Sequence, residues 1–172
     1  MAETVSANAK QQFLDTYEEE HATTMKVLRA YPVDKLDLRP HAMCKTAREL
    51  AWMFVLERGL GTRVFQNAFA SGGGPSGELP PPPESWDALL GALEKAHKEF
   101  GDLVRSTSEE QLGESVKFFT GPKTLGDYSR IKFAWFLLHD QIHHRGQFSI
   151  YLRMAGGKVP SIYGPTADEP WM

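Results

Sequence analysis

The sequence holds little of several features that would assign a function class at once. Its 172 residues include a single cysteine, Cys44, which excludes an internal disulfide and is typical of the reducing cytoplasm. No stretch approaches the roughly 18 consecutive apolar residues of a membrane span, and the N-terminus lacks the pattern of a secretory signal. The net charge of −3 gives no sign of a surface for nucleic acid or an anionic membrane. We therefore expect a cytoplasmic protein with one domain, 1–172, that binds neither.

Glycine and proline are concentrated in two places. Residues 71–85 contain the run SGGGPSGELPPPPES, which cannot form the interior of a helix or strand. No Lys-Ser or Lys-Thr pair follows its glycines, so a phosphate-binding loop is excluded. Residues 156–172 carry three prolines and are expected to be an irregular tail that packs onto the bundle through Val159, Ile162, Tyr163 and Trp171. Both segments are interpreted as loops attached to one domain.

Apolar residues elsewhere recur at intervals of three and four, which predicts helices. Thr46 and Glu49 have the spacing of a capping box at the start of the second helix. Ser85 is expected to cap the third, Thr124 or Asp127 the fourth. The four predicted helices cover residues 8–30, 46–69, 86–106 and 128–154. We therefore predict an all-α fold without a sheet, a four-helix bundle with crossover connections, in which sites are built from facing helices.

The stretch from His139 to Gln147, HDQIHHRGQ, contains three of the six histidines. On a helix, residues four apart project from the same face, which pairs His139 with His143 and Asp140 with His144. Either pair could hold a divalent ion such as zinc, nickel or iron, with a further ligand from another helix. A histidine cluster that only forms hydrogen bonds remains the alternative.

Three other ionisable residues stand out. Glu57 lies in an apolar run, where a carboxylate is costly unless it is paired or coordinated. It could be a functional group, or it could form an ion pair with Arg58 or Arg48. His21 and His97 are both expected at the surface.

Two stretches carry a resemblance to a known family. HDQIHHRGQFSIYLRMAGGKVPSIYGPTADE resembles the C-terminal signature of the DinB/YfiT-like superfamily of metalloenzymes, and ELAWMFVLERG resembles its second-helix motif. The resemblance implies a damage-inducible four-helix bundle. It also implies one divalent metal, held by a histidine of the second helix and two residues four apart on the last. Carried onto this chain, the pair on the last helix is Asp140 and His144.

The chain departs from that pattern on the second helix, where Met53 stands at the position of the usual histidine. A thioether is a poor ligand for such an ion. Three alternatives follow. Glu57, one turn away, could replace the histidine; the site could shift to His139 and His143, which the apolar periodicity places nearer the buried face; or metal affinity has been lost.

The resemblance also implies a function. Members with assigned activity are similar to S-transferases or isomerases that use a low-molecular-weight thiol, such as bacillithiol or mycothiol, and act on a small molecule. On this hypothesis Glu57 is a ligand or a base, and His143 or His139 orients a group or accepts a proton. Arg145 then holds a carboxylate of the thiol or substrate, unless it only forms a surface ion pair.

Two other functions stay open. The protein could be a non-catalytic, stress-associated bundle that has lost its metal, or a hydrolase that uses metal-bound water in place of a thiol. The resemblance implies a homodimer in each case.

Overall fold

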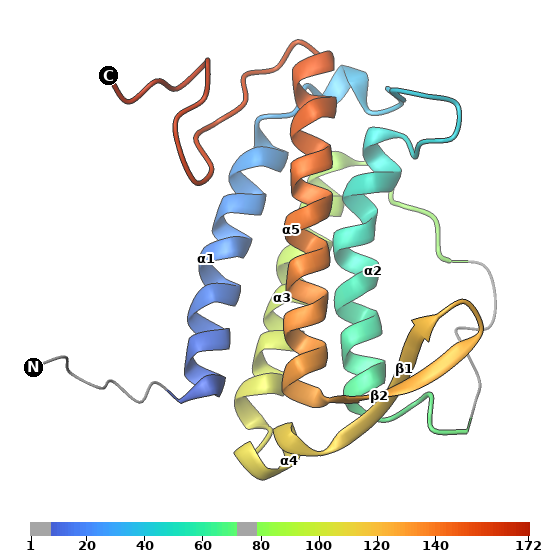
Figure 1. Cartoon of the computed structure of the whole chain (residues 1–172). Helices are drawn as coiled ribbons and strands as arrows, with labels where there is room; N and C mark the ends of the chain where they lie inside the picture. Colours follow the sequence, from blue (N-terminus) through green and yellow to red (C-terminus); the bar gives the residue numbers. More distant parts are fainter. Residues whose placement is uncertain (1–7, 72–78) are drawn as a thin grey trace, which may run out of the picture.

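The computed structural model describes residues 8–71 and 79–172, and four long helices dominate it (Figure 1). The long helices are α1 (Ala9–Arg29), α2 (Ala47–Phe65), α3 (Trp86–Ser106) and α5 (Arg130–Met154); the shorter elements are η1 (Val33–Lys35), α4 (Glu109–Gly113), β1 (Ser115–Gly121) and β2 (Thr124–Ser129). None of the helices in the described ranges has the length and apolar character that crossing a bilayer requires.

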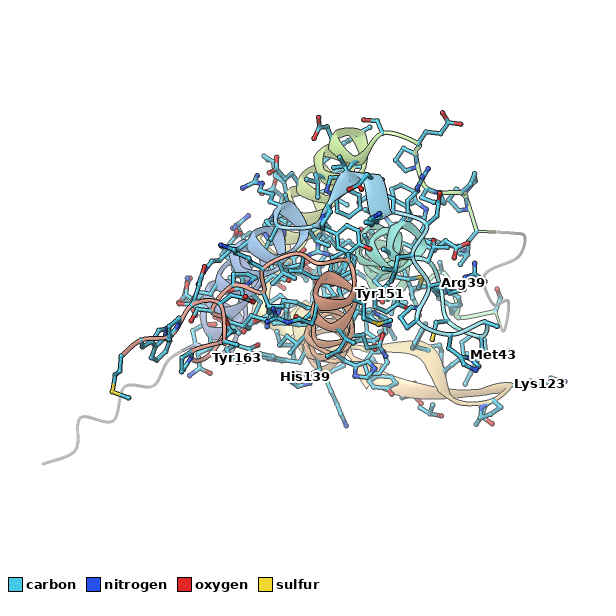
Figure 2. The ribbon with its side chains drawn as sticks, turned by 90° about the horizontal axis from the view of Figure 1, so that it is seen from above. Arg39, Met43, Lys123, His139, Tyr151 and Tyr163 are labelled. Atoms are coloured by element: carbon cyan, nitrogen blue, oxygen red, sulfur yellow. The ribbon has the colours of Figure 1, made fainter. Side chains whose placement is uncertain are left out.

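The long helices form the predicted bundle. α2 packs against α3 and α5, and α1 packs against the same two helices. Viewed from above, α1 and α2 therefore lie on one diagonal of the bundle, and α3 and α5 lie on the other (Figure 2). The connections from α1 to α2 and from α3 to α5 must cross the bundle, which confirms the crossover prediction.

Local sequence signals explain most helix ends. Thr46 and Glu49 form the predicted capping box of α2, and Ser85 caps α3 by accepting from the Ala88 amide. The prediction for α5 was wrong, because Ser129 is its N-cap, and Thr124 and Asp127 belong to β2.

The prediction that the fold has no sheet was also wrong. β1 and β2 pair as an antiparallel hairpin from Ser115↔Ser129 to Gly121↔Thr124. Lys123 in the turn has a φ of 57°, the left-handed conformation of tight turns. Phe118 packs edge-on against Phe133 of α5, with ring centroids 4.8 Å apart. The hairpin therefore caps one end of an otherwise helical fold.

The core consists of two apolar clusters separated by polar residues. One cluster includes Phe54, Leu93 and Phe148, and the other includes Val64, Phe100 and Leu138. On every long helix the buried polar residues lie between the two clusters. We call these residues the polar layer: Thr24, Glu57, Arg58, His97, Gln141 and Arg145.

The two predicted loops differ in what the structure describes. Within the Gly/Pro-rich segment, residues 72–78 lie outside the described residues, and 79–85 form no helix or strand. The tail, 156–172, is irregular as predicted, and its Val159 and Ile162 pack against the core. Tyr163 also contacts the bundle, because its ring centre lies 5.1 Å from the Arg145 guanidinium and its hydroxyl donates to Glu20. Trp171 is 65% exposed and donates to Ser161 of the tail, so the expectation was wrong for Trp171.

Candidate metal centre

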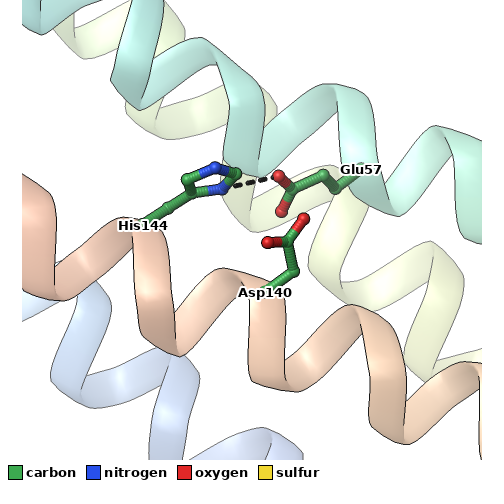
Figure 3. Close-up of side chains that lie close together, drawn as sticks. All are labelled: Glu57, Asp140 and His144. Atoms are coloured by element: carbon green, nitrogen blue, oxygen red, sulfur yellow. Dashed lines mark ion pairs between the residues drawn. The ribbon is translucent and has the colours of Figure 1, made fainter. Parts of the chain in front are cut away.

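Three potential ligands meet between α2 and α5. Glu57 of α2 points toward Asp140 and His144 of α5 (Figure 3). One ligand atom from each residue lies within 4.8 Å of the other two. Glu57 is 5% exposed, and the other two are half-buried. We call these three residues the trio.

Several polar atoms of the trio have no hydrogen-bond partner. His144 Nδ1 and Glu57 Oε1 form an ion pair at 2.7 Å, drawn as a dashed line in Figure 3. The two groups are not aligned as a hydrogen bond, and both Glu57 oxygens and His144 Nδ1 are buried without a hydrogen-bond partner among the described residues. A hydrogen bond weakens steeply when it is misaligned, so the attraction between these two groups is mainly that of their charges. Buried polar atoms without partners are rare and call for an explanation. Atoms that converge on one point without bonding to each other are the arrangement expected of ligands around a cation.

The electrostatics of the trio favour an added positive charge. Burial raises the pKa of the Glu57 carboxyl, while His144 acts in the opposite direction. The adjacent Glu57 carboxylate raises the pKa of the His144 imidazole above its ordinary value, and burial opposes that shift. Without a cation, the pair therefore tends to retain a proton. A divalent ion would supply the charge that this proton otherwise provides.

The donor set fits a divalent metal. Two carboxylates and one imidazole suit zinc, iron or nickel, and three protein ligands leave a coordination position for water or a substrate. Of the three alternatives that Met53 raised, the arrangement favours the first, in which Glu57 takes the place of the missing histidine.

Helix phase explains why Glu57 reaches the trio while its neighbour does not. Adjacent residues on a helix point about 100° apart. Arg58 turns toward α1 and donates to the Tyr17 hydroxyl at 3.3 Å, and Arg48 pairs with Asp37. Neither arginine forms the ion pair with Glu57 that the sequence left open.

The other candidate pair lies elsewhere on α5. His139 and His143 are exposed, and Figure 2 shows His139 at the outer edge of the bundle. His143 Nε2 lies 2.9 Å from the Gln147 amide nitrogen. The expectation that the apolar periodicity brings this pair nearer the buried face was wrong, because Gln141 and Arg145 occupy that face.

Arg145 is buried, and residues of this chain already surround its guanidinium. Nη1 lies 2.5 Å from a Glu20 carboxylate oxygen, and Nη2 donates to the Tyr163 hydroxyl at 2.5 Å. These partners come from α1 and the tail, whereas the trio lies between α2 and α5. Arg145 is thus neither a surface ion pair nor directed at the trio.

A second polar cluster, which we call the stacked cluster, was missed from the sequence. Its rings are those of Tyr17, His21 and His97. His21 stacks on His97 with ring centroids 3.7 Å apart, and Tyr17 stacks on the other side of His97 at 4.2 Å. His97 is 6% exposed, so its predicted surface position was wrong. Arg58 closes the cluster through Tyr17.

Comparisons with known proteins agree with this fold. The uncharacterized protein YrdA of Bacillus subtilis strain 168 is 27% identical over 158 residues, which is 91% of this chain and 89% of that protein. The crystal structure of a DinB-like protein from Bacillus cereus ATCC 10987 matches with a TM-score of 0.70 at 23% identity, over 89% of this chain and 97% of that one.

A second solved structure gives the same result. The DinB-like protein YjoA of Bacillus subtilis matches with a TM-score of 0.67 at 15% identity, over 94% of this chain and 99% of that one. At such identities, the two structures show a shared fold. The model of the DinB family matches residues 1–171, and the chain therefore belongs to the DinB family.

Proposed function

We propose that the protein binds one divalent metal through Glu57, Asp140 and His144 and uses it in a reaction on a small molecule. The observation that carries the proposal is the convergence of three ligand atoms within 4.8 Å while the buried oxygens of Glu57 stay without hydrogen-bond partners. The ion pair with His144 at Oε1 compensates this carboxylate only in part, because Oε2 has no hydrogen-bond partner among the described residues, and a buried carboxylate is destabilising unless it is coordinated or fully paired.

The proposed reaction is the transfer of a low-molecular-weight thiol to an electrophile. A divalent ion held there would lower the pKa of a bound thiol or water and so supply a nucleophile at neutral pH. The chain's own residues divide the remaining work. Asp140 and His144 fix the position from one turn of α5, and Glu57 contributes from α2 as the third ligand. A rigid pair of helices thus sets where the nucleophile stands.

The positions of His139, His143 and Arg145 determine which roles we propose for them. His139 and His143 are exposed, which gives them access to solvent protons, and the centre of the His143 ring lies 5.7 Å from that of His144. Arg145 is proposed to hold α5 against α1 through Glu20 and not to bind substrate. The family resemblance further favours a homodimer, which sedimentation of the purified protein would test.

Metal content is the decisive test. We would measure it by elemental mass spectrometry on protein without a histidine tag, for the wild type and for the Asp140→Ala/His144→Ala variant. We expect about one metal ion per chain in the wild type and little in the variant, because one ligand cannot hold the ion. The matched control is His139→Ala/His143→Ala, which removes the exposed pair with the same spacing on the same helix.

The two double variants give opposite readings. Loss of metal only at 140/144 supports the trio. Loss only at 139/143 would move the site to the exposed pair. No uptake by the wild type in excess zinc, nickel or iron would refute the metal centre and leave a non-catalytic bundle.

Thiol transfer and hydrolysis can be separated by omitting the thiol. With 1-chloro-2,4-dinitrobenzene, the thiol sulfur would bond to the ring carbon as chloride leaves, and the absorbance of the thioether reports the product. We expect metal-dependent product formation with bacillithiol or mycothiol and none without a thiol. Thiol-independent release of chloride would instead indicate a hydrolase.

A further inference from the structure

A groove runs along the outer face of α2 beside α3. Its volume is about 630 Å³, which lies within the range of small-molecule sites. Apolar side chains from three segments make up most of its lining, including Trp52, Val55, Leu56, Leu79, Ala92 and Ala96. Trp52 Nε1 donates to the Pro80 carbonyl at 2.7 Å. This hydrogen bond attaches the segment at Pro80 to α2 and holds one wall of the groove in position.

Two glycines of α2 differ in what explains their presence. A Cβ on Gly61 would lie 2.7 Å from Leu137 Cδ1 and 2.8 Å from Phe100 Cε2, so close helix packing requires glycine there. A Cβ on Gly59 would meet nothing within 4 Å, although glycine within a helix costs about 1 kcal/mol relative to alanine. Packing therefore explains Gly61 but not Gly59. Gly59 lies in the groove lining, where any side chain would take up the space.

The groove lining and the trio share one residue. Glu57 belongs both to the groove lining and to the trio, whereas no residue of α5 lines the groove. A molecule lying in the groove would therefore have one side next to α2 at Glu57. This position suits the non-reacting body of a substrate whose reactive part lies at the trio.

The charges at the rim indicate which end group the molecule carries. Lys95 already pairs with Glu99 at 3.7 Å. Arg63 is exposed, and it takes part in no ion pair among residues 8–71 and 79–172. Its guanidinium lies 5.4 Å from the centre of the Phe69 ring, which helps to hold it in place. Arg63 is thus available to a carboxylate or sulfonate.

We propose that the α2–α3 groove binds an amphipathic anion, with its aliphatic or aromatic body against Trp52, Leu56 and Gly59 and its acidic group at Arg63. The assignment of this molecule as the substrate rests on the proposed function of the trio. The binding itself rests on the groove alone.

The test uses two fluorescent probes of nearly the same shape. 8-Anilino-1-naphthalenesulfonate is an anion, and N-phenyl-1-naphthylamine is its neutral counterpart. We expect one molecule of the anionic probe to bind per chain. Gly59→Leu should lower the affinity for both probes at least about tenfold, because the new side chain fills the groove. Leucine also favours the helix over glycine, so loss of folding would not explain the result.

Two further variants complete the design. Gly146→Leu makes the same change at an exposed position of α5 where a Cβ would also meet nothing within 4 Å, and it should leave both probes bound. Arg63→Gln should lower the affinity for the anionic probe alone, by about threefold to fivefold. This factor corresponds to the free energy of one exposed ion pair. Equal binding by wild type and Gly59→Leu would overturn the proposal. So would a dimer that Gly59→Leu converts to a monomer, because a second copy would then cover the groove.

The probe measurements do not depend on metal. Probe binding by a protein that takes up no metal would support the groove and refute only the metal centre. Metal uptake without probe binding would refute the groove and leave the metal centre standing.

Discussion

Glu57 and Arg58 are neighbours in the sequence, yet they belong to two polar clusters of opposite character. Arg58 is 2% exposed, and it donates to the Phe54 carbonyl at 2.8 Å and to the Tyr17 hydroxyl. Glu57 is almost as buried, but neither of its oxygens has a hydrogen-bond partner among the described residues. Among the described residues, the stacked cluster therefore has one buried polar side-chain atom without a hydrogen-bond partner, His97 Nδ1, whereas the trio has three.

This difference separates a structural role from a ligand site. Buried polar groups that bond to one another hold helices in register. Buried polar atoms without hydrogen-bond partners are costly, and a ligand from outside the chain can remove that cost. We therefore interpret the stacked cluster as a joint between α1, α2 and α3, and the trio as a site.

The largest effect is expected from removing the joint. Arg58→Ala should lower the free energy of unfolding by about 3 kcal/mol, because it leaves a cavity and unpaired groups in the core. For a chain of this size, the melting temperature should fall by about 6–12 °C. Urea unfolding and calorimetry measure both quantities. The control is Arg63→Ala on the exposed face of the same helix, which should change stability by less than about 0.5 kcal/mol.

Arg58→Ala should also leave metal content unchanged. A variant that folds but has lost its metal would show that the two clusters act as one unit.

Glu57→Gln should give the opposite pattern. In metal-free protein, the loss of a buried charge offsets the loss of its attraction to His144, so stability should change by no more than about 1 kcal/mol. Metal at 100 times its dissociation constant should stabilise the wild type by about 2.7 kcal/mol, and this gain should be largely absent in the variant. Thermal unfolding with and without added zinc measures both effects. An equal gain in the two proteins would exclude Glu57 as a ligand.

The smallest effect concerns pH. Burial, together with the charges of His97 and Arg58, lowers the pKa of His21 from 6.5 to about 3. Below pH 6.5 the unfolded chain therefore binds a proton that the folded chain does not, and stability falls as the pH falls toward 3. Between pH 7 and pH 5, the loss from His21 should be about 1 kcal/mol, after allowance for the part of the ring that water screens.

Urea unfolding at the two pH values tests this effect. His21→Gln should remove most of the loss, whereas the same change at exposed His139 should not. A loss that persists in His21→Gln would assign the acid sensitivity to another group.

Much of the fold could be predicted from the sequence, because its signals are local. The apolar spacing gave the four long helices, and the Thr46 capping box gave the start of α2. The hairpin was missed because Gly126 and the irregular register between Phe119 and Gly121 interrupt the alternation that indicates strands.

The stacked cluster and the trio show what could not be predicted from the spacing of residues along single helices. His97 follows Leu93 by four residues and precedes Phe100 by three, so the spacing did place it on the buried stripe. The prediction placed His97 on the side opposite to much of the apolar stripe, and that assignment was wrong. For the last helix, the pair 140/144 came from the family resemblance, whereas the apolar spacing pointed to 139/143. No local pattern could show that Glu57 meets Asp140, since that contact depends on how α2 and α5 pack.

Gly61 lies one turn beyond Glu57 on α2 and is not a member of the trio. Because its missing side chain lets α2 approach Leu137 of α5, the gap between the helices is set at this residue. The distance from Glu57 to Asp140 and His144 therefore depends on the absence of a side chain at Gly61. The radius of an ion that the trio could coordinate depends on the same feature.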